Sequence, residues 1–374
     1  MPYKIFIAMS KTASYITLGC KLNYAETSTY ERGFIQAGYE SVPWNNGADL
    51  FVINTCSVTE HADKKSRNII RKLHKVSPDA TIVVTGCYAQ LKKAEVEALE
   101  GVSLVFGANE KSSLVTTTLD YIAQRTEMAR PVTSAACDTC HETGEHGEVT
   151  SSDNAPDDTA AITGTRHEAG EPVDSTKLYR ENVLDGTKPS NSGILYRENV
   201  LSDTKSTDAA STATTSQQEE TFAAYSSGEE RTRSFLKVQD GCDNFCAYCT
   251  VPYARGRSRS ISIDKAVSEA KKISASGVKE IVLTGVNTGD FGRKTGESFL
   301  DLLKALNDVQ GIERYRISSI EPNLLTDDIV DWIASGTKFL PHFHIPLQSG
   351  SDTILKDVGR KYTTEFFANK IAYI

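Results

Sequence analysis

Three closely spaced cysteines constrain this chain more than any other feature. The stretch DGCDNFCAYCTVPYARGRSRS, residues 240–260, places Cys242, Cys246 and Cys249 in the pattern CxxxCxxC. Thiolates at this spacing suit a cubane iron-sulfur cluster, and three of them leave one iron without a protein ligand. The amino and carboxylate groups of S-adenosylmethionine can fill that position, and reductive cleavage of the sulfonium then yields a radical.

Two other metal sites are compatible with the same spacing. One is a zinc knuckle that lacks a ligand, and the other is a ferredoxin whose fourth cysteine lies elsewhere. Zinc would need a nearby cysteine or histidine, and the next candidates downstream are His342 and His344, about 90 residues away. This distance favours the iron-sulfur interpretation.

Length and composition indicate a soluble cytoplasmic protein of two or three domains. The chain has 374 residues and no run approaching the roughly 18 apolar residues of a membrane span, and its N-terminus lacks the features of a signal peptide. Without export, the eight cysteines are expected to be metal ligands or redox groups rather than disulfides. Free buried thiols are the alternative.

Strand-like and helix-like patterns alternate in two parts of the chain, which predicts an α/β protein. In residues 1–130, apolar runs such as DLFVINTC and ATIVVTGC alternate with polar helical stretches, which predicts an open parallel sheet of the flavodoxin or Rossmann type. Residues 231–374 repeat strand-helix units and predict a partial (β/α) barrel, in which chemistry gathers at the carboxyl ends of the strands. One of these predicted strands is HFHIPLQ, residues 342–348.

The segment between them, residues 131–230, is rich in Ser, Thr, Asp, Glu and Gly and is expected to be a disordered acidic insert. It contains a duplication, LYRENVLDGTK at residues 178–188 and LYRENVLSDTK at 195–205. We interpret this as slippage in a tolerant linker rather than as a partner-binding motif. The CDTC pair, Cys137 and Cys140, is interpreted as incidental rather than as a metal or dithiol site.

The residues outside the acidic insert carry a small net positive charge. Residues 137–230 hold 19 acidic and 6 basic residues, a charge of −13, against −8 for the whole chain, so the rest carries +5. A basic body is compatible with a polyanionic partner, although an ordinary mixed surface would have the same charge.

The sequence resembles the radical S-adenosylmethionine methylthiotransferase family, whose signature is CxxxCxxC. The segments LGCKLNYAET, VINTCSVTEHADKKSR and GCYAQ are similar to the N-terminal domain of that family, which implies that Cys20, Cys56 and Cys87 hold a second 4Fe-4S cluster. Their positions at strand exits would bring them to one edge of the sheet. The segments GCKLN with ET, PYARGRSRS and HIPLQSGSD are most similar to the branch that acts on threonylcarbamoyladenosine at position 37 of tRNA.

The resemblance implies a transferase with two 4Fe-4S clusters that uses two S-adenosylmethionine molecules. One molecule would methylate sulfur at the N-terminal cluster, and the other would give the radical that abstracts hydrogen from C2 of the adenine. The implied partners are tRNA, an electron donor of the flavodoxin or ferredoxin type and a sulfur source. Alternatives are isopentenyladenosine-37 of tRNA or a ribosomal-protein aspartate as substrate, a single-cluster radical enzyme, or an inactive truncated product.

The resemblance also suggests cofactor-binding residues. Tyr248, before the last cysteine, would lie near the adenine. Further cofactor contacts are implied at strand ends, where a structural turn or cap is the alternative: Gly285, Asn287, Ser319, Glu321 and Gln348. The alternating Arg255, Arg257 and Arg259 are expected to face phosphate or the cofactor carboxylate, or else to form a solvated basic strand edge.

Two departures from the family are visible in the sequence. About 100 polar residues separate the two cysteine-bearing parts, where the family has a short linker. The chain also stops at FANKIAYI, before the rest of the barrel and the small basic β-barrel RNA-binding module that the family carries. These departures lead us to expect a C-terminally truncated product.

Overall fold

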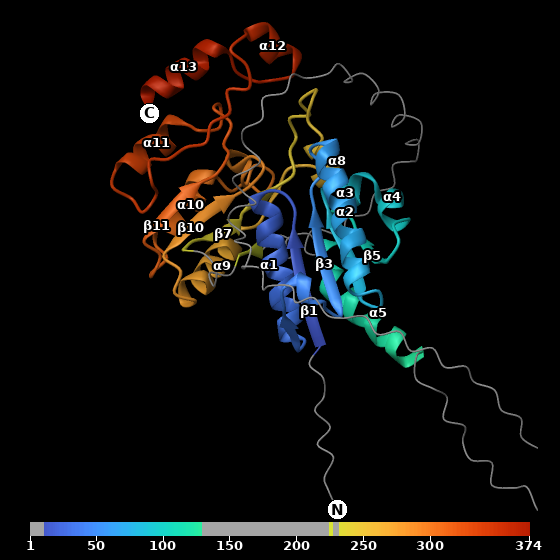
Figure 1. The fold of residues 1–374 in the computed structure, drawn as a ribbon. Coiled ribbons are helices and arrows are strands. Elements are labelled where there is room, and N and C mark those ends of the chain that lie inside the picture. The colour runs from blue at the N-terminus through green and yellow to red at the C-terminus, as the bar shows by residue number, and fades with distance from the viewer. Residues whose placement is uncertain (1–10, 129–223, 227–231) are drawn as a thin grey trace, which may run out of the picture. The chain divides into compact units, whose positions relative to one another are not determined.

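The computed structural model of the chain describes residues 11–128, 224–226 and 232–374 (Figure 1). The sequence duplication and the pair Cys137 and Cys140 lie outside the described residues. The two cysteine-bearing parts belong to one compact unit of the chain.

The N-terminal part is built on a five-stranded parallel sheet with the strand order β2-β1-β3-β4-β5. This is the flavodoxin-like order, so the predicted open parallel sheet is confirmed. The central strands β3 and β4 are buried along their whole length, as their continuous apolar runs predict. The strands are β1 (Lys11–Thr17), β2 (Tyr39–Ser41), β3 (Leu50–Thr55), β4 (Thr81–Gly86) and β5 (Val102–Phe106).

Helices cover both faces of this sheet. Side chains of β3 alternate between two apolar clusters: Phe51 and Ile53 pack in the cluster that includes Leu73 of α2, whereas Leu50 and Val52 pack with Phe34 of α1. The helices of this part are α1 (Lys21–Gln36), α2 (Glu60–Val76), α3 (Cys87–Leu91), α4 (Lys93–Glu97) and α5 (Leu114–Met128), with short 3₁₀ turns η1 (Trp44–Asn46) and η2 (Lys111–Ser113).

The C-terminal part holds a four-stranded sheet with the order β11-β10-β7-β6, in which β6 alone runs antiparallel. A two-stranded ribbon of β8 and β9 lies beside the cysteine loop. The strands are β6 (Ala224–Tyr225), β7 (Ser234–Lys237), β8 (Gln239–Asp240), β9 (Arg259–Ser260), β10 (Glu280–Thr284) and β11 (Arg314–Ile317). The helices are α8 (Val251–Arg255), α9 (Ile263–Ala275), η3 (Thr288–Asp290), α10 (Phe299–Asn307), α11 (Asp327–Ala334), α12 (Asp352–Asp357) and α13 (Thr364–Tyr373).

The alternation of β7, α9, β10, α10 and β11 confirms the predicted partial barrel, but two local predictions were wrong. Residues 342–348 do not form a strand, and this region joins the sheet only through isolated bridges, one between Ser319 and His344. Pro341 and Pro346 explain the difference, because proline has no N–H to donate to a strand ladder. Strand β6 lies inside the segment expected to be disordered, since a strand of two residues shows no periodicity in the sequence.

Helix α1 connects the two sheets. Its residue Ala25 joins Ala224, Phe235 and Val282 in a small apolar cluster, and the guanidinium of Arg32 lies 3.7 Å from the centre of the Tyr225 ring. The helix that follows the first cysteine therefore also packs on the part that carries the CxxxCxxC loop. Among the helices that the structure describes, none is long and apolar enough to cross a membrane.

Candidate functional site

Cys20, Cys56 and Cys87 lie at the carboxyl ends of three neighbouring parallel strands. Cys20 is the N-cap of α1 beyond β1, Cys56 directly follows β3, and Cys87 begins α3 directly after β4. Thr17 pairs with Asn54, and Thr55 with Gly86, so the three strands end at the same level. The structure thus brings these cysteines to one edge of the sheet, as their positions in the sequence predict.

Close backbone approach holds these loops together. Gly86 has φ +101°, and a Cβ there would lie 2.3 Å from the carbonyl oxygen of Thr55, a distance that only glycine avoids. A Cβ on Gly19 would lie 3.1 Å from the Cβ of Cys56, so the first two cysteine loops are neighbours. The backbone before Cys20 and Cys87 is therefore shaped for the convergence of the three thiols.

The thiols of this first triad lie beside positive charge. Burial raises the pKa of the Cys56 and Cys87 thiols, and Arg255 lowers it in both. Cys20 is exposed, and its sulfur lies 3.9 Å from Nη2 of Arg255. The side chain of Asn23 accepts from the Cys20 thiol at 3.4 Å and donates to the carbonyl oxygen of Thr55 at 2.9 Å.

The second triad lies on the loop that follows β8. The N–H of Cys249 donates to the carbonyl oxygen of Cys246 at 2.9 Å, which folds the loop into a turn, and Phe245 takes a positive φ of 46°. The N–H of Cys242 donates to the carbonyl oxygen of Gly256 at 3.1 Å, so the loop is closed at its base. All six cysteines of the two triads are free thiols.

Tyr248 lies in a polar network that includes Arg360, an arginine that sequence analysis missed. The Tyr248 hydroxyl donates to Oε1 of Gln348 at 2.7 Å and accepts from Nη2 of Arg360 at 2.5 Å. Nη1 of Arg360 contacts Oε1 of Glu321 at 2.6 Å. Three residues expected to bind the cofactor therefore share one polar network, whose centre lies 112 positions from Tyr248 along the chain.

The other predicted cofactor residues lie at neighbouring strand ends. The side-chain oxygen of Asn287 accepts a hydrogen bond from the backbone N–H of Glu321 at 3.2 Å. The backbone N–H of Asn287 donates to Oε1 of Gln239 at 2.9 Å. A Cβ on Gly285 would lie 2.8 Å from the same oxygen of Gln239, and Ser319 pairs with His344 at 3.0 Å. These contacts hold Asn287 and Ser319 at neighbouring strand ends, and their contact with the cofactor stays a prediction.

The three arginines after the second triad do not share one environment, which corrects the prediction for Arg255. Its side chain is 3% exposed on helix α8, whereas that of Arg257 is 69% exposed and that of Arg259 is 26% exposed. Arg255 therefore faces neither phosphate nor solvent. The sequence shows the alternation of these residues but not the distant acidic partners that draw Arg255 inward.

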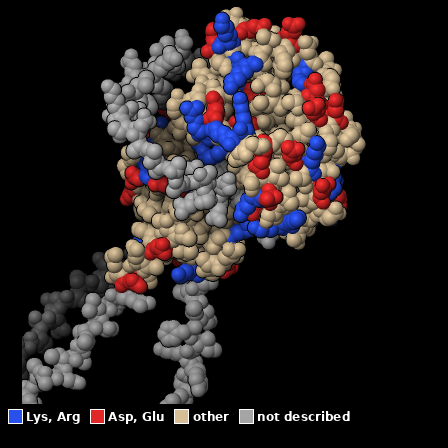
Figure 2. Space-filling view, turned by 180° about the vertical axis from the view of Figure 1, so that it is seen from behind, with Lys and Arg blue, Asp and Glu red and all other residues tan. Residues whose placement is uncertain are grey.

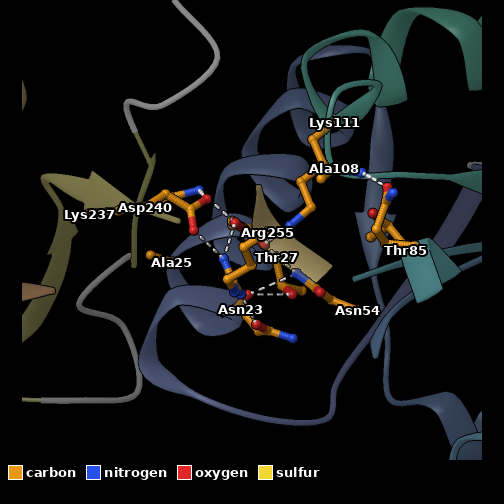
Figure 3. Close-up of polar contacts among 12 residues, drawn as sticks. Asn23, Ala25, Thr27, Asn54, Thr85, Ala108, Lys111, Lys237, Asp240 and Arg255 are labelled. Carbon is orange, nitrogen blue, oxygen red and sulfur yellow. Dashed lines mark hydrogen bonds and ion pairs between the residues drawn. The ribbon is translucent and has the colours of Figure 1, made fainter. Parts of the chain in front are cut away.

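Those partners form a buried charge network, of which Figure 3 labels Lys111, Lys237, Asp240 and Arg255. Glu26 contacts Nζ of Lys237 at 2.6 Å, Nζ of Lys111 at 2.8 Å and Nη1 of Arg255 at 3.2 Å. Asp240 contacts Lys237 at 2.8 Å and Arg255 at 3.0 Å. All five side chains are at most 8% exposed. Sequence analysis missed four of them, because each stands alone within an ordinary helix, strand or turn.

The donor sets consist of thiols, the ligand type of iron-sulfur clusters. Within residues 11–128, 224–226 and 232–374, no three His, Cys, Asp or Glu side chains are grouped so that one metal ion could bind them. Each cysteine of a 4Fe-4S cluster binds a different iron, so three thiols around a cluster lie farther apart than three ligands of one ion.

Two family models match the chain. One, described as "Uncharacterized protein family UPF0004", matches residues 12–107, and the other, the radical SAM superfamily, matches residues 236–374. A solved structure of the radical S-adenosylmethionine methyltransferase TsrM from Kitasatospora setae matches with a TM-score of 0.51 and 15% identity, covering 98% of this chain and 65% of that chain. At this identity, the likeness concerns the fold.

Curated relatives match nearly the whole chain. Threonylcarbamoyladenosine tRNA methylthiotransferase MtaB of Bacillus subtilis is 34% identical over 96% of this chain and 62% of its own length. The protein of the same name from Aquifex aeolicus is 31% identical over 96% of this chain and 68% of its own length. The chain thus spans about two thirds of the length of these relatives. By these matches and by its two cysteine triads, the chain belongs to the radical S-adenosylmethionine methylthiotransferase family.

Proposed function

We propose that this chain adds a methylthio group to C2 of N6-threonylcarbamoyladenosine at position 37 of tRNA. The observation that carries the proposal is the presence of two triads of free cysteines, one at the carboxyl ends of β1, β3 and β4 and one on the loop that follows β8. The MtaB relatives support this substrate over that of tRNA-2-methylthio-N(6)-dimethylallyladenosine synthase from Carboxydothermus hydrogenoformans, which is 27% identical.

The residues present fit two 4Fe-4S clusters. The second triad, Cys242, Cys246 and Cys249, would hold the radical cluster, and the first triad would hold the N-terminal cluster. When bound, the radical cluster supplies the electron that cleaves S-adenosylmethionine, and the N-terminal cluster supplies the sulfur site for the methylthio group. We also propose that an electron donor of the flavodoxin or ferredoxin type and a sulfur source serve the reaction.

The polar network around Arg360 would orient S-adenosylmethionine beside the second triad. Tyr248 is 55% exposed, so one face of its ring is open to a ligand while its hydroxyl is held by Arg360 and Gln348. A ring fixed at its hydroxyl is a suitable stacking surface for adenine. Glu321 neutralises the guanidinium of Arg360, which keeps this positioning group from attracting phosphate.

Exposed aromatic and basic side chains beside the same loop would bind the RNA. Phe245 and Tyr253 are 40% and 60% exposed, and their rings meet edge to face at 5.9 Å. The guanidinium of Arg257 lies 4.5 Å from the centre of the Phe245 ring. Aromatic rings and arginine planes bind unpaired bases by stacking, and position 37 lies in the anticodon loop. We name Phe245, Tyr253 and Arg257 the aromatic platform.

The charge of the surface is compatible with this partner. Figure 2 shows lysine and arginine side chains gathered around a hollow on one face of the molecule. Positive charge around a concave surface raises the local concentration of a polyanion. A tRNA substrate therefore accords with both the aromatic platform and the basic side chains.

Iron analysis and nucleoside analysis together test the proposal. After anaerobic reconstitution, the chain should bind about eight irons, and variants in which either triad is changed to alanine should bind about four. With S-adenosylmethionine, dithionite and tRNA that carries threonylcarbamoyladenosine but no methylthio group, mass spectrometry should detect the 2-methylthio nucleoside.

Each outcome decides a separate part of the proposal. About four irons in the unchanged chain would show that the N-terminal cluster is not formed and would favour a single-cluster radical enzyme. Eight irons with modification of dimethylallyladenosine alone would overturn the substrate. Eight irons with cleavage of S-adenosylmethionine but no modified nucleoside in any tRNA would contradict the methylthiotransferase activity of this chain.

A further inference from the structure

The charge network beside the first triad holds more positive than negative groups. Glu26 and Asp240 are its two carboxylates, and its buried cations are Lys111, Lys237 and Arg255, while the partly exposed Arg259 also lies 3.7 Å from Asp240. The two carboxylates and the three buried cations are almost completely removed from water. An uncompensated buried charge is costly, so such a network favours a negative group close by.

The excess charge points at the first triad. Nη1 of Arg255 contacts both carboxylates of the network, whereas Nη2 turns away from them toward Oδ1 of Asn23 and lies 3.9 Å from the sulfur of Cys20. Figure 3 shows Arg255 between Asp240 on one side and Asn23 on the other.

A cluster at this triad would supply the missing negative charge. Three thiolates contribute −3 and an oxidised 4Fe-4S core contributes +2, so the assembly carries a net charge of −1. One-electron reduction makes the cluster more negative, and the fixed guanidinium favours that state because opposite charges attract strongly where water is excluded.

Rotation of Arg255 away from this position is opposed by its partners. Its Nη1 lies between Glu26 of α1 and Asp240 of β8, and these carboxylates are themselves held by Lys237 at 2.6 and 2.8 Å. Helix α8, which carries Arg255, packs against α3, which begins at Cys87. The guanidinium is thus fixed from both parts of the chain.

We propose that Arg255 is a positioning residue that raises the reduction potential of the cluster held by Cys20, Cys56 and Cys87. The inference rests on the proposed function for the assignment of that cluster. It makes helix α8, which follows the loop of the second triad, responsible for the electronic properties of the cluster at the first triad, because Arg255 lies six residues after Cys249. Hydrogen bonds and positive charge near cluster sulfurs are established means of tuning a potential.

The test is a redox titration of the reconstituted full chain with dithionite, followed by electron paramagnetic resonance. The triad variants assign the two cluster signals. Arg255→Met should lower the potential of the N-terminal cluster and leave that of the other cluster unchanged. Arg255→Lys keeps the charge but loses the second nitrogen, so its shift should have the same direction and be smaller. Asp240→Asn removes a competing negative charge and should shift the potential in the opposite direction.

The control is Arg125, an exposed residue in the last turn of helix α5. Arg125→Met removes the same charge far from both cysteine loops in the sequence and should shift neither potential. Arg255→Met could fail to assemble the N-terminal cluster and bind only about four irons. In that case, an iron content of about eight in Arg255→Lys would support the positioning role. The direction of the potential shift would then come from Asp240→Asn. The inference would be overturned if the reduction potentials of both clusters shifted equally. It would also be overturned if Arg255→Met and Asp240→Asn bound about eight irons and shifted neither potential. About four irons in the unchanged chain would instead contradict the proposed function.

Discussion

Nη2 of Arg255 lies 3.9 Å from the sulfur of Cys20, although 235 positions separate the two residues. The contact joins helix α8, which follows one cysteine triad, to the first cysteine of the other. It depends on Glu26, because this buried carboxylate holds Arg255 together with Lys111 and Lys237. Four predictions follow from the contacts around the two triads.

Glu26→Gln should destabilise the chain strongly. The substitution leaves three buried cations with Asp240 as their nearest carboxylate, and removal of one partner of a buried pair costs about 3–5 kcal/mol. The free energy of unfolding in urea measures the effect. Glu100→Gln is the control, because Glu100 is 88% exposed and pairs with His74 at 3.7 Å, so its change should cost less than about 1 kcal/mol. Equal losses in the two variants would show that the network does not stabilise the fold.

Gly86→Ala should impair iron binding at the first triad. An added Cβ would lie 2.3 Å from the Thr55 carbonyl oxygen, so the strand ends before Cys56 and Cys87 must separate. Gly38→Ala has a similar φ of +89° with no atom within 4 Å of the added Cβ, and it isolates the cost of backbone strain, about 1–3 kcal/mol. The expected result is loss of about four irons in Gly86→Ala alone. Normal iron content in that variant would contradict the geometry of this edge.

Glu280 should contribute stability that depends on pH. Burial raises the pKa of this carboxyl, but hydrogen bonds from Arg316 and Arg314 outweigh burial and hold the pKa below its usual range. Because the folded pKa is the lower one, the contribution is present above the unfolded value of about 4.3 and is lost as pH falls through the folded pKa. The cluster-free chain should therefore be more stable than Glu280→Gln at pH 7, by a margin that shrinks in acid.

The matched control for this pH dependence is Glu313→Gln. Glu313 lies beside the same arginine pair, but its side chain is 57% exposed and its contacts with Lys279 and Arg314 are both 3.8 Å. This variant should show the pH dependence of the unchanged chain. A difference between the unchanged chain and Glu280→Gln that stays constant from pH 7 to pH 3.5 would mean that the ion pairs do not carry the effect.

Removal of the aromatic platform should weaken RNA binding without loss of iron. Base-aromatic stacking is worth about 1–3 kcal/mol per ring, so Phe245→Ala and Tyr253→Ala should each weaken binding of an anticodon stem-loop about 5- to 150-fold. Fluorescence anisotropy with a labelled stem-loop measures the affinity. Trp44→Ala removes an equally cation-paired ring, 4.5 Å from Lys72, on the N-terminal part and should leave the affinity unchanged. Similar losses at Trp44 and Phe245 would place the RNA elsewhere.

Much of the fold followed from local patterns. Continuous apolar runs predict strands β3 and β4, and period-3.6 patterns with a serine before them predict helices such as α9, because burial and hydrogen bonding follow directly from residue order there. The predicted strand at residues 342–348 was wrong because two prolines interrupt its hydrogen bonding. The two-residue strand β6 was missed because two residues are too few to show a periodic pattern.

The amino-acid sequence by itself determined which thiols are available and, through parallel strand order, that Cys20, Cys56 and Cys87 share one edge of a sheet. Only the tertiary structure decided that Arg255 is buried and faces Cys20, and that Arg360 joins Tyr248 to Glu321. The reason is physical. Spacing along the chain fixes groups on one loop or one strand end, whereas a buried charge takes its partners from segments that meet only after both sheets have formed and excluded water.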